Sequence, residues 1–497
     1  MKTKDNSLYQ GLTLSLLLLL VTSCSPSPSP GNQSKFNVLF IAVDDLNDWT
    51  GFLNGHPQAV TPNMDRLARQ GMVFERAYCA APVCNPSRVA LMTGYRPSTS
   101  GIYGNNDFMR EADLLKDALT IPQWFSKHGY HTMARGKIFH HANGKWADTI
   151  SWNDWQKNEG RSMTIHPALT DSTLVNGMPY NTRHQRALDW GPMQIDVNET
   201  SDFKTAKWAA HILQEKHDKP FFLACGIFRP HLPWYVPHKY FDSLAKSNIE
   251  VPAINEADLE DLSPFGKQIS EGLNVDGDYQ RIKGYGLQEA AVQGYLVSIR
   301  YADDCVGEVL SALEKSAYKD KTIVVLWGDH GWHLGEKLHY RKFVLWEEST
   351  RVPLIIYVPG LTNGERCSQP VNLIDLYPTL LDLCGLPENT NNEGRSIVPL
   401  LKNAEATWDF PSITTMGPNR HAVRTKQWRY IQYDDGSEEL YDHHKDSLEW
   451  INLANKTEYK TTINELSRWL PSVNTLPVSG GLDIKGQFRG EQDREKL

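Results

Sequence analysis

Residues 36–45 read FNVLFIAVDD, an almost continuous apolar run that ends in two aspartates. Such runs are typical of a strand in a parallel sheet, because helices cover both faces of that strand. Three later segments have the same character: residues 220–226 (PFFLACG), 322–327 (TIVVLW) and 352–358 (VPLIIYV). The sequence therefore predicts four buried strands.

Two stretches near these strands carry helical patterns. Thr61-Pro62 places a capping residue before a proline at the first helical position, and Gly71 ends the pattern. Residues 288–313 repeat Ala, Val and Leu at helical spacing. The alternation of strands and helices predicts the α/β class, with a large, mainly parallel sheet flanked by helices.

Acidic residues follow two of the predicted strands. Asp44 and Asp45 come directly after the first strand, and Asp329 and His330 come after the strand over 322–327. Ligands of open α/β sheets bind outside the carboxyl ends of the strands, so we expect the two pairs to be neighbours in space. The three aspartates offer the oxygen ligands that Ca²⁺ prefers. The alternative is that Asp44 and Asp45 only cap a helix.

The pattern of predicted secondary structure changes near Pro411, from long strands and helices to short strand-like segments. Short segments at 412–415, 421–424, 428–433 and 439–441 alternate with Gly and Asp turns, and a helical pattern covers 456–469. We expect a small antiparallel sheet there. This divides the mature chain into a catalytic domain over 36–405 and a C-terminal subdomain with a tail over 406–497.

The first residues predict export. Residues 1–24 combine two lysines, an apolar run over 12–21 and the ending VTSC, which resembles a bacterial lipobox with Cys24 as the lipidated residue. Residues 25–35 are a Ser/Pro-rich tether. We expect a bacterial lipoprotein in the periplasm or on the outer membrane, held to the membrane by lipid on Cys24. The alternative is an ordinary cleaved signal peptide with an incidental cysteine.

Charge and cysteine content argue against a nucleic-acid-binding protein and against a zinc-binding or disulfide-rich protein. The 497 residues carry 51 Lys and Arg against 59 Asp and Glu, so no basic excess is available for nucleic acid. The seven cysteines are scattered and show neither a zinc spacing nor a disulfide framework, which favours buried thiols over disulfide partners.

The most specific motif is Cys84-Asn-Pro-Ser-Arg88, followed by VALMTG. Together with the aspartate pair and the Asp-His pair, it resembles the type I, formylglycine-dependent sulfatases, from about Phe36 to the C-terminal subdomain. The resemblance is strongest to the iduronate-2-sulfatase branch. The segments that carry it are 44–47 (DDLN), 136–140 (GKIFH), 229–233 (RPHLP) and 329–336 (DHGWHLGE). It implies an alkaline-phosphatase-like sulfatase fold and an exported bacterial polysaccharide sulfatase.

The resemblance also implies a modified nucleophile and a metal. Cys84 would be oxidised to formylglycine by a formylglycine-generating enzyme or an anaerobic sulfatase-maturating enzyme. The hydrated aldehyde would provide one hydroxyl to attack sulfur and a second whose proton loss expels sulfate. Cys84 and His330 would join the three aspartates around Ca²⁺. His330 stands where many members of the family have Asn, and imidazole is a poor ligand for calcium.

The remaining roles come from the same resemblance. Arg88 would stabilise the hydrated formylglycine, Lys137 and His140 would bind sulfate and the nucleophile, and His231 would protonate the leaving alkoxide. Lys342 would bind sulfate, with Arg341 as its alternative. Two ordinary interpretations stay open: Arg88 as a surface arginine, and Lys137 with His140 as a solvated turn. Two further pairs stay open: His333 and His339 as structural or rim residues, and Asn105 and Asn106 as sugar contacts or turn residues.

The predicted activity is hydrolysis of sulfate esters on a polysaccharide or its oligosaccharides. The candidate substrates are a 2-O-sulfated uronate of a glycosaminoglycan and the sulfated rhamnose and uronate of ulvan-type polymers. Two alternatives compete with this prediction: a formylglycine-dependent phosphonate or phosphodiester hydrolase, and an inactive surface lipoprotein that binds glycans.

Overall fold

The computed structural model describes residues 36–181, 183–244, 248–271 and 277–478. The predicted signal peptide and tether, with Cys24, lie outside the described residues, as does the end of the tail. No helix in these ranges is long and apolar enough to cross a membrane.

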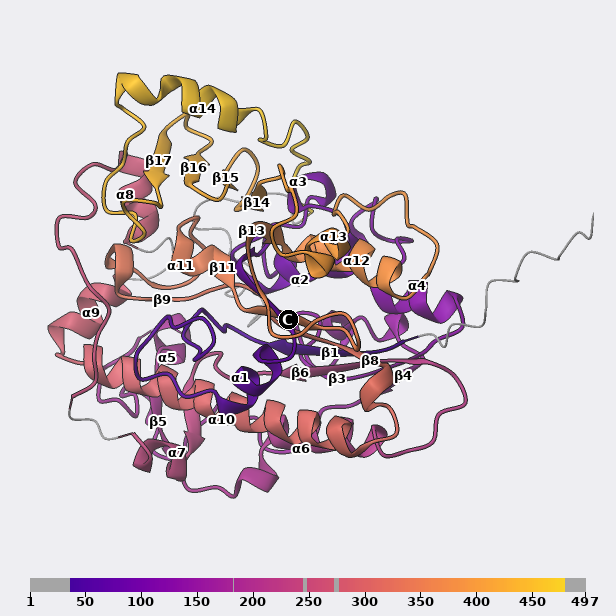
Figure 1. Cartoon of the computed structure of the whole chain (residues 1–497). Helices are drawn as coiled ribbons and strands as arrows, with labels where there is room; N and C mark the ends of the chain where they lie inside the picture. Colours follow the sequence, from indigo (N-terminus) through magenta and orange to yellow (C-terminus); the bar gives the residue numbers. More distant parts are fainter. Residues whose placement is uncertain (1–35, 182, 245–247, 272–276, 479–497) are drawn as a thin grey trace, which may run out of the picture. The chain divides into compact units, whose positions relative to one another are not determined.

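A nine-stranded sheet forms the centre of the described chain, in the order β11-β2-β12-β8-β1-β6-β3-β4 with β13 paired to β2 (Figure 1). Its strands are β1 (Asn37–Val43), β2 (Met72–Tyr78), β3 (His131–Gly136), β4 (Asp154–Gln156), β6 (Phe221–Ile227), β8 (Thr322–Gly328), β11 (Arg351–Val352), β12 (Leu354–Tyr357) and β13 (Arg366–Asn372). Strands β8, β1, β6, β3 and β4 run parallel to one another, and β12 pairs antiparallel with the other side of β8. The sheet is therefore mainly parallel, as predicted.

The segment predicted as the fourth strand differs from a single strand. Pro353 separates β11 from β12, and both run antiparallel to β2. Proline has no backbone N–H for the ladder, which explains the break. The Pro353 carbonyl still accepts a hydrogen bond from the Gly328 N–H at 3.0 Å, so the break stays attached to β8.

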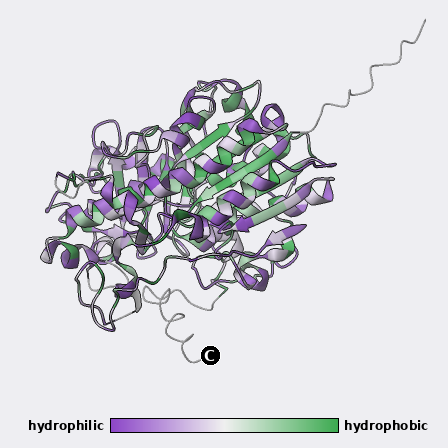
Figure 2. Ribbon diagram, turned by 90° about the horizontal axis from the view of Figure 1, so that it is seen from below, coloured by the Kyte–Doolittle hydropathy of each residue, from purple (hydrophilic) through white to green (hydrophobic). Residues whose placement is uncertain are grey.

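Helices cover both faces of the sheet (Figure 1). One face packs on α1 (Pro62–Ala68), α6 (Ser201–Ile212) and α10 (Gln288–Lys315); the other packs on α2 (Cys84–Thr93), α4 (Ile121–Lys127), α12 (Leu376–Leu383) and α13 (Val398–Lys402). In β1, Leu39 and Ile41 face the first group and Val38 and Phe40 the second. Figure 2 shows the central strands as the most hydrophobic ribbons. Burial on both faces explains the unbroken apolar run that identified β1.

A four-stranded antiparallel sheet follows near the C-terminus, as predicted. It consists of β14 (Ser412–Thr415), β15 (His421–Arg424), β16 (Trp428–Gln432) and β17 (Glu438–Asp442). One face packs on Val344 and Trp346, and the other on α14 (Lys460–Ser467). The α14 helix is shorter than the predicted 456–469, because a 3₁₀ turn, Thr457–Tyr459, precedes it.

Shorter elements complete the described chain. They are α3 (Pro97–Ser100), α5 (Arg183–Ala187), β5 (Trp190–Met193), β7 (Trp234–Pro237), α7 (His238–Asp242), α8 (Pro264–Ser270), α9 (Asp278–Gly284), β9 (His333–Leu334), β10 (Tyr340–Arg341) and α11 (Glu347–Thr350). The six described cysteines are buried free thiols, which confirms that they form no disulfide framework.

Candidate active site

Four adjacent parallel strands end at one edge of the sheet, in the spatial order β8, β1, β6, β3. Asp329 and His330 follow β8, Asp44 and Asp45 follow β1, and Lys137 follows β3. The Asp45 N–H donates a hydrogen bond of 3.0 Å to Asp329 Oδ1, which brings the two acidic pairs together as the topology predicted. The edge thus collects polar groups that are up to about 290 residues apart in the sequence.

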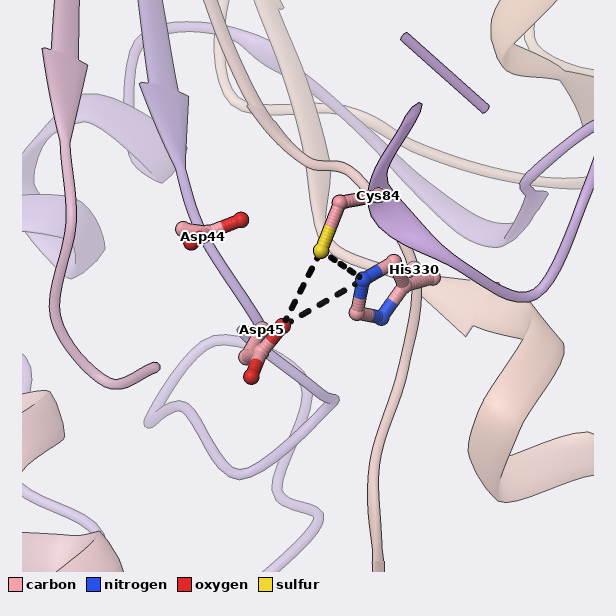
Figure 3. Close-up of side chains that lie close together, drawn as sticks. All are labelled: Asp44, Asp45, Cys84 and His330. Atoms are coloured by element: carbon pink, nitrogen blue, oxygen red, sulfur yellow. Dashed lines mark hydrogen bonds and ion pairs between the residues drawn. The ribbon is translucent and has the colours of Figure 1, made fainter. Parts of the chain in front are cut away.

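Cys84 begins α2 and is fully buried against this edge. Figure 3 shows its sulfur directed between Asp45 and His330. Its Sγ lies 3.3 Å from His330 Nε2, 3.0 Å from Lys342 Nζ and 3.7 Å from Lys137 Nζ. Burial opposes ionisation, but the two ammonium groups outweigh it and lower the pKa of the Cys84 thiol well below its usual value. The position therefore stabilises negative charge on the side chain of residue 84.

Arg88 lies one helical turn after Cys84 and is also fully buried. Its guanidinium donates to Asp329 Oδ2 and to Asp44 Oδ1, both at 2.8 Å. It also donates to the carbonyls of Lys137 at 2.6 Å and Ile138 at 2.9 Å. One fork thus joins the ends of β1, β3 and β8. Its hydrogen bonds fix the strand ends, and its charge acts on Cys84 electrostatically.

The acidic groups fit a hard divalent cation. Donor atoms of Asp44, Asp45, Cys84 and His330 lie within 4.8 Å of one another, and Asp329 Oδ2 is 3.5 Å from His330 Nε2. Within the described ranges Asp45 Oδ2 is buried without a hydrogen-bond partner, which leaves one carboxylate oxygen of the group uncommitted. His330 Nδ1 faces the Gly331 carbonyl at 3.0 Å, so that nitrogen carries the proton and Nε2 is available as a ligand.

Asp45 holds its position through an uncommon backbone conformation. Its φ is +59°, a region that costs a non-glycine residue about 1–3 kcal/mol. Tyr295, on α10, donates its hydroxyl proton to the Asp45 carbonyl at 2.6 Å and accepts a hydrogen bond from the Asn47 N–H at 2.9 Å. Sequence reasoning missed Tyr295, because a tyrosine within an amphipathic helix gives no signal of such a contact.

The two lysines face carboxylates as well as Cys84. Lys137 Nζ lies 2.5 Å from Asp44 Oδ2, and Lys342 Nζ lies 2.5 Å from Asp45 Oδ1. Arg341, the alternative to Lys342, instead forms an ion pair of 2.6 Å with Asp278 on α9. Of the two neighbours, the structure therefore places Lys342 at Cys84.

Two histidines complete the group. His140 is next to Cys84, and burial lowers its pKa although a hydrogen bond with Cys84 opposes that effect, so the ring is neutral at pH 7. The side chain of His231 is 28% exposed, and its Nε2 lies 3.9 Å from Asp45 Oδ2. Its Nδ1 lies 2.6 Å from the Leu232 carbonyl. His231 thus sits between the buried charges and solvent.

Three of the open residues have structural contacts. His333 and His339 pack against each other with ring centroids 5.3 Å apart, and their Nδ1 atoms face the carbonyls of Glu336 and Ser270. Asn105 Oδ1 accepts a hydrogen bond from the Asn85 N–H at 3.0 Å, beside the start of α2. These contacts favour the structural interpretation of all three.

Comparison with known proteins gives a consistent result. Residues 36–386 match the family described as Sulfatase, and residues 328–475 match the one described as N-sulphoglucosamine sulphohydrolase, C-terminal. A protein named Sulfatase from Formosa agariphila is 39% identical over 451 residues, covering 88% of this chain and 87% of that protein. Iduronate 2-sulfatase from Homo sapiens is 31% identical, covering 70% and 69%.

Two further similarities are more distant. Ulvan-active sulfatase from Formosa agariphila is 28% identical, covering 87% of this chain and 80% of that protein. The solved structure of a phosphonate monoester hydrolase from Agrobacterium radiobacter matches with a TM-score of 0.71 at 19% identity, covering 87% of this chain and 94% of that one. The second match concerns the fold alone, because its sequence identity is low.

Proposed function

We propose that this protein hydrolyses sulfate esters of a sulfated polysaccharide or its oligosaccharides. The chain belongs to the sulfatase family and has the alkaline-phosphatase-like fold of that family. Family membership establishes a sulfuric ester hydrolase; the glycan substrate, the formylglycine and the calcium ion are the proposal. The observation that carries it is the position of Cys84, buried at the start of α2 with two lysine ammonium groups and an imidazole within 3.7 Å of its sulfur.

Cys84 would act after oxidation to formylglycine by a maturating enzyme. When hydrated, that group supplies a geminal diol, with one hydroxyl to form the bond to sulfur and a second whose deprotonation releases sulfate. The surroundings of Cys84 suit this chemistry, because cations that stabilise a thiolate also stabilise an oxygen anion at the same place. Neutral His140, beside residue 84, is available to accept a proton from the diol.

Lys137 and Lys342 are the proposed sulfate-binding residues. Lys137 and Lys342 approach Cys84 with ammonium groups 3.7 Å and 3.0 Å from its sulfur. A sulfate group bonded to residue 84 would therefore place its oxygens against both. Their charges would stabilise the negative charge that accumulates on those oxygens in the transition state.

The leaving alkoxide needs a proton, and His231 is the proposed donor. It lies at the boundary between the buried charges and solvent, and its Nε2 faces Asp45. A general acid in this position would contribute on the order of 10²–10⁴ in rate for a poor leaving group.

The proposed cation is Ca²⁺, held by Asp44, Asp45, Asp329 and His330 together with modified residue 84. Its charge would lower the pKa of the attacking hydroxyl and neutralise sulfate oxygens. The carboxylates suit calcium, and His330 is the softer member of the set. Exhaustive chelation should abolish activity, and addition of Ca²⁺ should restore it.

The proposed substrate is a 2-O-sulfated uronate at a chain end. Its support is the similarity to a protein named iduronate 2-sulfatase, at 31% identity over most of this chain. The relative named ulvan-active sulfatase supports sulfated rhamnose or uronate as the competing choice. Reduction of the substrate carboxylate to an alcohol should lower kcat/KM about 30- to 150-fold if a cationic residue binds it. An unchanged rate would favour a neutral sugar.

The decisive experiment combines chemistry with mass spectrometry. Peptide mapping of protein co-expressed with a maturating enzyme should show the Cys84 thiol replaced by an aldehyde, and that protein should hydrolyse 4-nitrophenyl sulfate faster than an aryl phosphonate. Cys84→Ser should fail in multiple turnover, because a sulfated serine has no second hydroxyl to expel sulfate. Full activity with an unmodified thiol would refute the formylglycine. Preference for the phosphonate would indicate the competing hydrolase, and no turnover by the matured protein would indicate a glycan-binding lipoprotein.

The site of action is part of the same proposal. We place the enzyme at the outer membrane or in the periplasm, anchored by lipid on Cys24. Labelled fatty acid should enter the native protein, and Cys24→Ala should release it from the membrane fraction. Equal membrane association of both forms would contradict the anchor.

A further inference from the structure

A cavity of about 290 Å³ lies at the opposite end of α2 from Cys84. Its walls come from four segments: 96–99, which follows α2, 393–395, 411–413 and 468–473. The ten residues of α2 correspond to about 15 Å, so one sulfate group cannot contact both Cys84 and this cavity. The Glu393 N–H donates to the carbonyl of Gly94, the residue that ends α2, at 2.8 Å, which attaches the cavity wall to that helix.

The lining of the cavity is cationic. Arg96, Arg395 and Arg468 contribute three guanidinium groups, and Glu393 contributes one carboxylate. That carboxylate is already engaged, because it accepts hydrogen bonds from the Arg96 N–H at 2.5 Å and the Thr99 hydroxyl at 2.7 Å. Among residues 36–478 that the structure describes, no side chain or carbonyl accepts a hydrogen bond from any of the three guanidinium groups. Three guanidinium groups therefore line the cavity beside the engaged carboxylate of Glu393, and the buried Asp375 acts on Arg96 and Arg395 from behind the lining.

A buried hydroxyl adds a second polar group without a partner. Ser98 is 1% exposed, lines the cavity, and its Oγ has no hydrogen-bond partner within the described ranges. Buried polar atoms are almost always paired, and an unpaired one indicates a ligand or water at that place. Burial lowers the pKa of Arg96, and the neighbouring Arg395 charge adds to this, whereas Asp375 and Glu393 oppose it. An anion would relieve that repulsion between guanidinium groups.

Aromatic rings border the same cavity. Trp469 lines it and is 37% exposed, and its ring centroid is 6.2 Å from that of Phe410. The Arg395 guanidinium lies 4.2 Å from the Phe410 centroid, so the ring holds it at the rim. Guanidinium groups bind oxyanions in a planar fork, and an exposed indole can stack on a sugar face. Both features together match a sulfated saccharide better than a free ion.

We propose that this cavity, defined by Arg96, Ser98, Arg395, Arg468 and Trp469, is a second binding site for sulfated glycan, separate from the active site. A sulfo group would occupy the guanidinium cluster, and the sugar that carries it would stack on Trp469. The role in catalysis rests on the proposed function: a polymer held here would raise the local concentration of its ends at Cys84 and lower KM for long substrates.

The test uses the full-length chain with Cys84→Ala, so that no turnover occurs. An excess of 4-nitrophenyl sulfate occupies the active site, and a heparin-derived octasaccharide is titrated by calorimetry. We expect Arg395→Ala/Arg468→Ala and, separately, Trp469→Ala to weaken binding about tenfold or more, which is the loss of one good charge-assisted contact. Both arginines are solvent-exposed, so folding should persist, and the melting temperature checks this. Arg69→Ala, an exposed arginine in another part of the chain, is the matched control and should bind normally.

Three results would overturn the proposal. The first is that the desulfated octasaccharide, which keeps its carboxylates, binds as tightly as the sulfated one. The second is that inorganic sulfate alone binds as tightly, which would show a simple anion site, and the third is unchanged binding by both cavity variants. In enzyme with Cys84 intact, the variants should raise KM for the sulfated polymer and leave hydrolysis of 4-nitrophenyl sulfate unchanged. Failure of the parent enzyme to hydrolyse any sulfate ester would refute the proposed function, while the titration would still test the cavity.

Discussion

Replacement of Lys342 by methionine tests the proposed sulfate site most directly. Methionine keeps most of the aliphatic stem and removes only the ammonium group. In the structure that group lies 3.0 Å from Cys84 Sγ and 2.5 Å from Asp45 Oδ1. Burial opposes the charge, but Asp45 outweighs it and raises the pKa of Lys342, so the side chain is cationic throughout any practical assay range. The substitution therefore removes one full positive charge at every pH.

The expected loss follows from the position of that charge. Removal of one preorganised donor to a developing oxyanion costs about 2.7–4 kcal/mol, which is 10²–10³ in kcat. Lys137 remains 3.7 Å from Cys84 Sγ and limits the loss to this range. We expect kcat for 4-nitrophenyl sulfate to fall by that factor. KM should change less, because the oxygens carry more charge in the transition state than in the bound ester.

Arg341→Met is the matched control, since it removes the charge of the residue next to Lys342, at the end of β10. Arg341 contacts Asp278 instead of Cys84, and Asp278 keeps Arg281 as a second partner at 3.8 Å. Mass spectrometry of both variants should show the same extent of formylglycine, so that maturation does not confound the rates. Equal losses in the two variants would show that loop distortion causes the effect, and would refute the placement of Lys342 on sulfate.

Three further predictions address the acid, the metal and the C-terminal sheet. His231→Ala should lower kcat about 10²–10⁴-fold on a sugar sulfate but little on 4-nitrophenyl sulfate, whose leaving group needs no proton; equal losses on both would contradict a general acid. Asp45→Asn should weaken Ca²⁺ binding at least about tenfold in a direct titration, and unchanged affinity would remove Asp45 from the ligand set. Burial opposes ionisation of Glu449, but Arg429 and His443 lower its pKa to about 2, below the ordinary 4.5. Its stabilising contribution is therefore present above about pH 4.5 and is lost as the pH falls towards 2, an effect of about 3 kcal/mol. Urea unfolding between pH 6 and pH 3 should show this decline in the parent enzyme and a smaller one in Glu449→Gln.

Strands with a continuous apolar run could be predicted from the sequence, whereas strands of the central sheet that carry charged residues, such as β2, could not. The continuous apolar run of β1 comes from helices on each side of it. The β2 strand was missed because its central Glu75 and Arg76 interrupt the pattern; they are half-buried and bind Arg366 and the Ser368 carbonyl of β13. Their place in the sheet depends on a partner almost 300 residues away, which local periodicity does not contain.

Some residues of the candidate site could also be predicted from the sequence, and others could not. The rule that ligands bind at the carboxyl ends of strands was sufficient to place Asp44 and Asp45 beside Asp329 and His330. It gave no position for residues that reach the site from outside the sheet. Tyr295, which supports the backbone of Asp45, comes from the middle of α10, and only the packing of that helix on the sheet brings it there.

The buried charges explain why so many elements meet at this edge. Three carboxylates, those of Asp44, Asp45 and Asp329, are fully buried, and each would cost several kcal/mol without a partner. Arg88 satisfies two of them through a rigid fork whose remaining bonds go to backbone carbonyls, so it cannot leave without disrupting three strand ends. The lysines differ, because each is a point charge on a flexible stem with one close carboxylate. They can therefore turn towards an incoming sulfate while Arg88 keeps the ends of β1, β3 and β8 in place. The division between a fixed guanidinium and two movable ammonium groups would allow one cluster both to fold and to bind the sulfate of the proposed substrate.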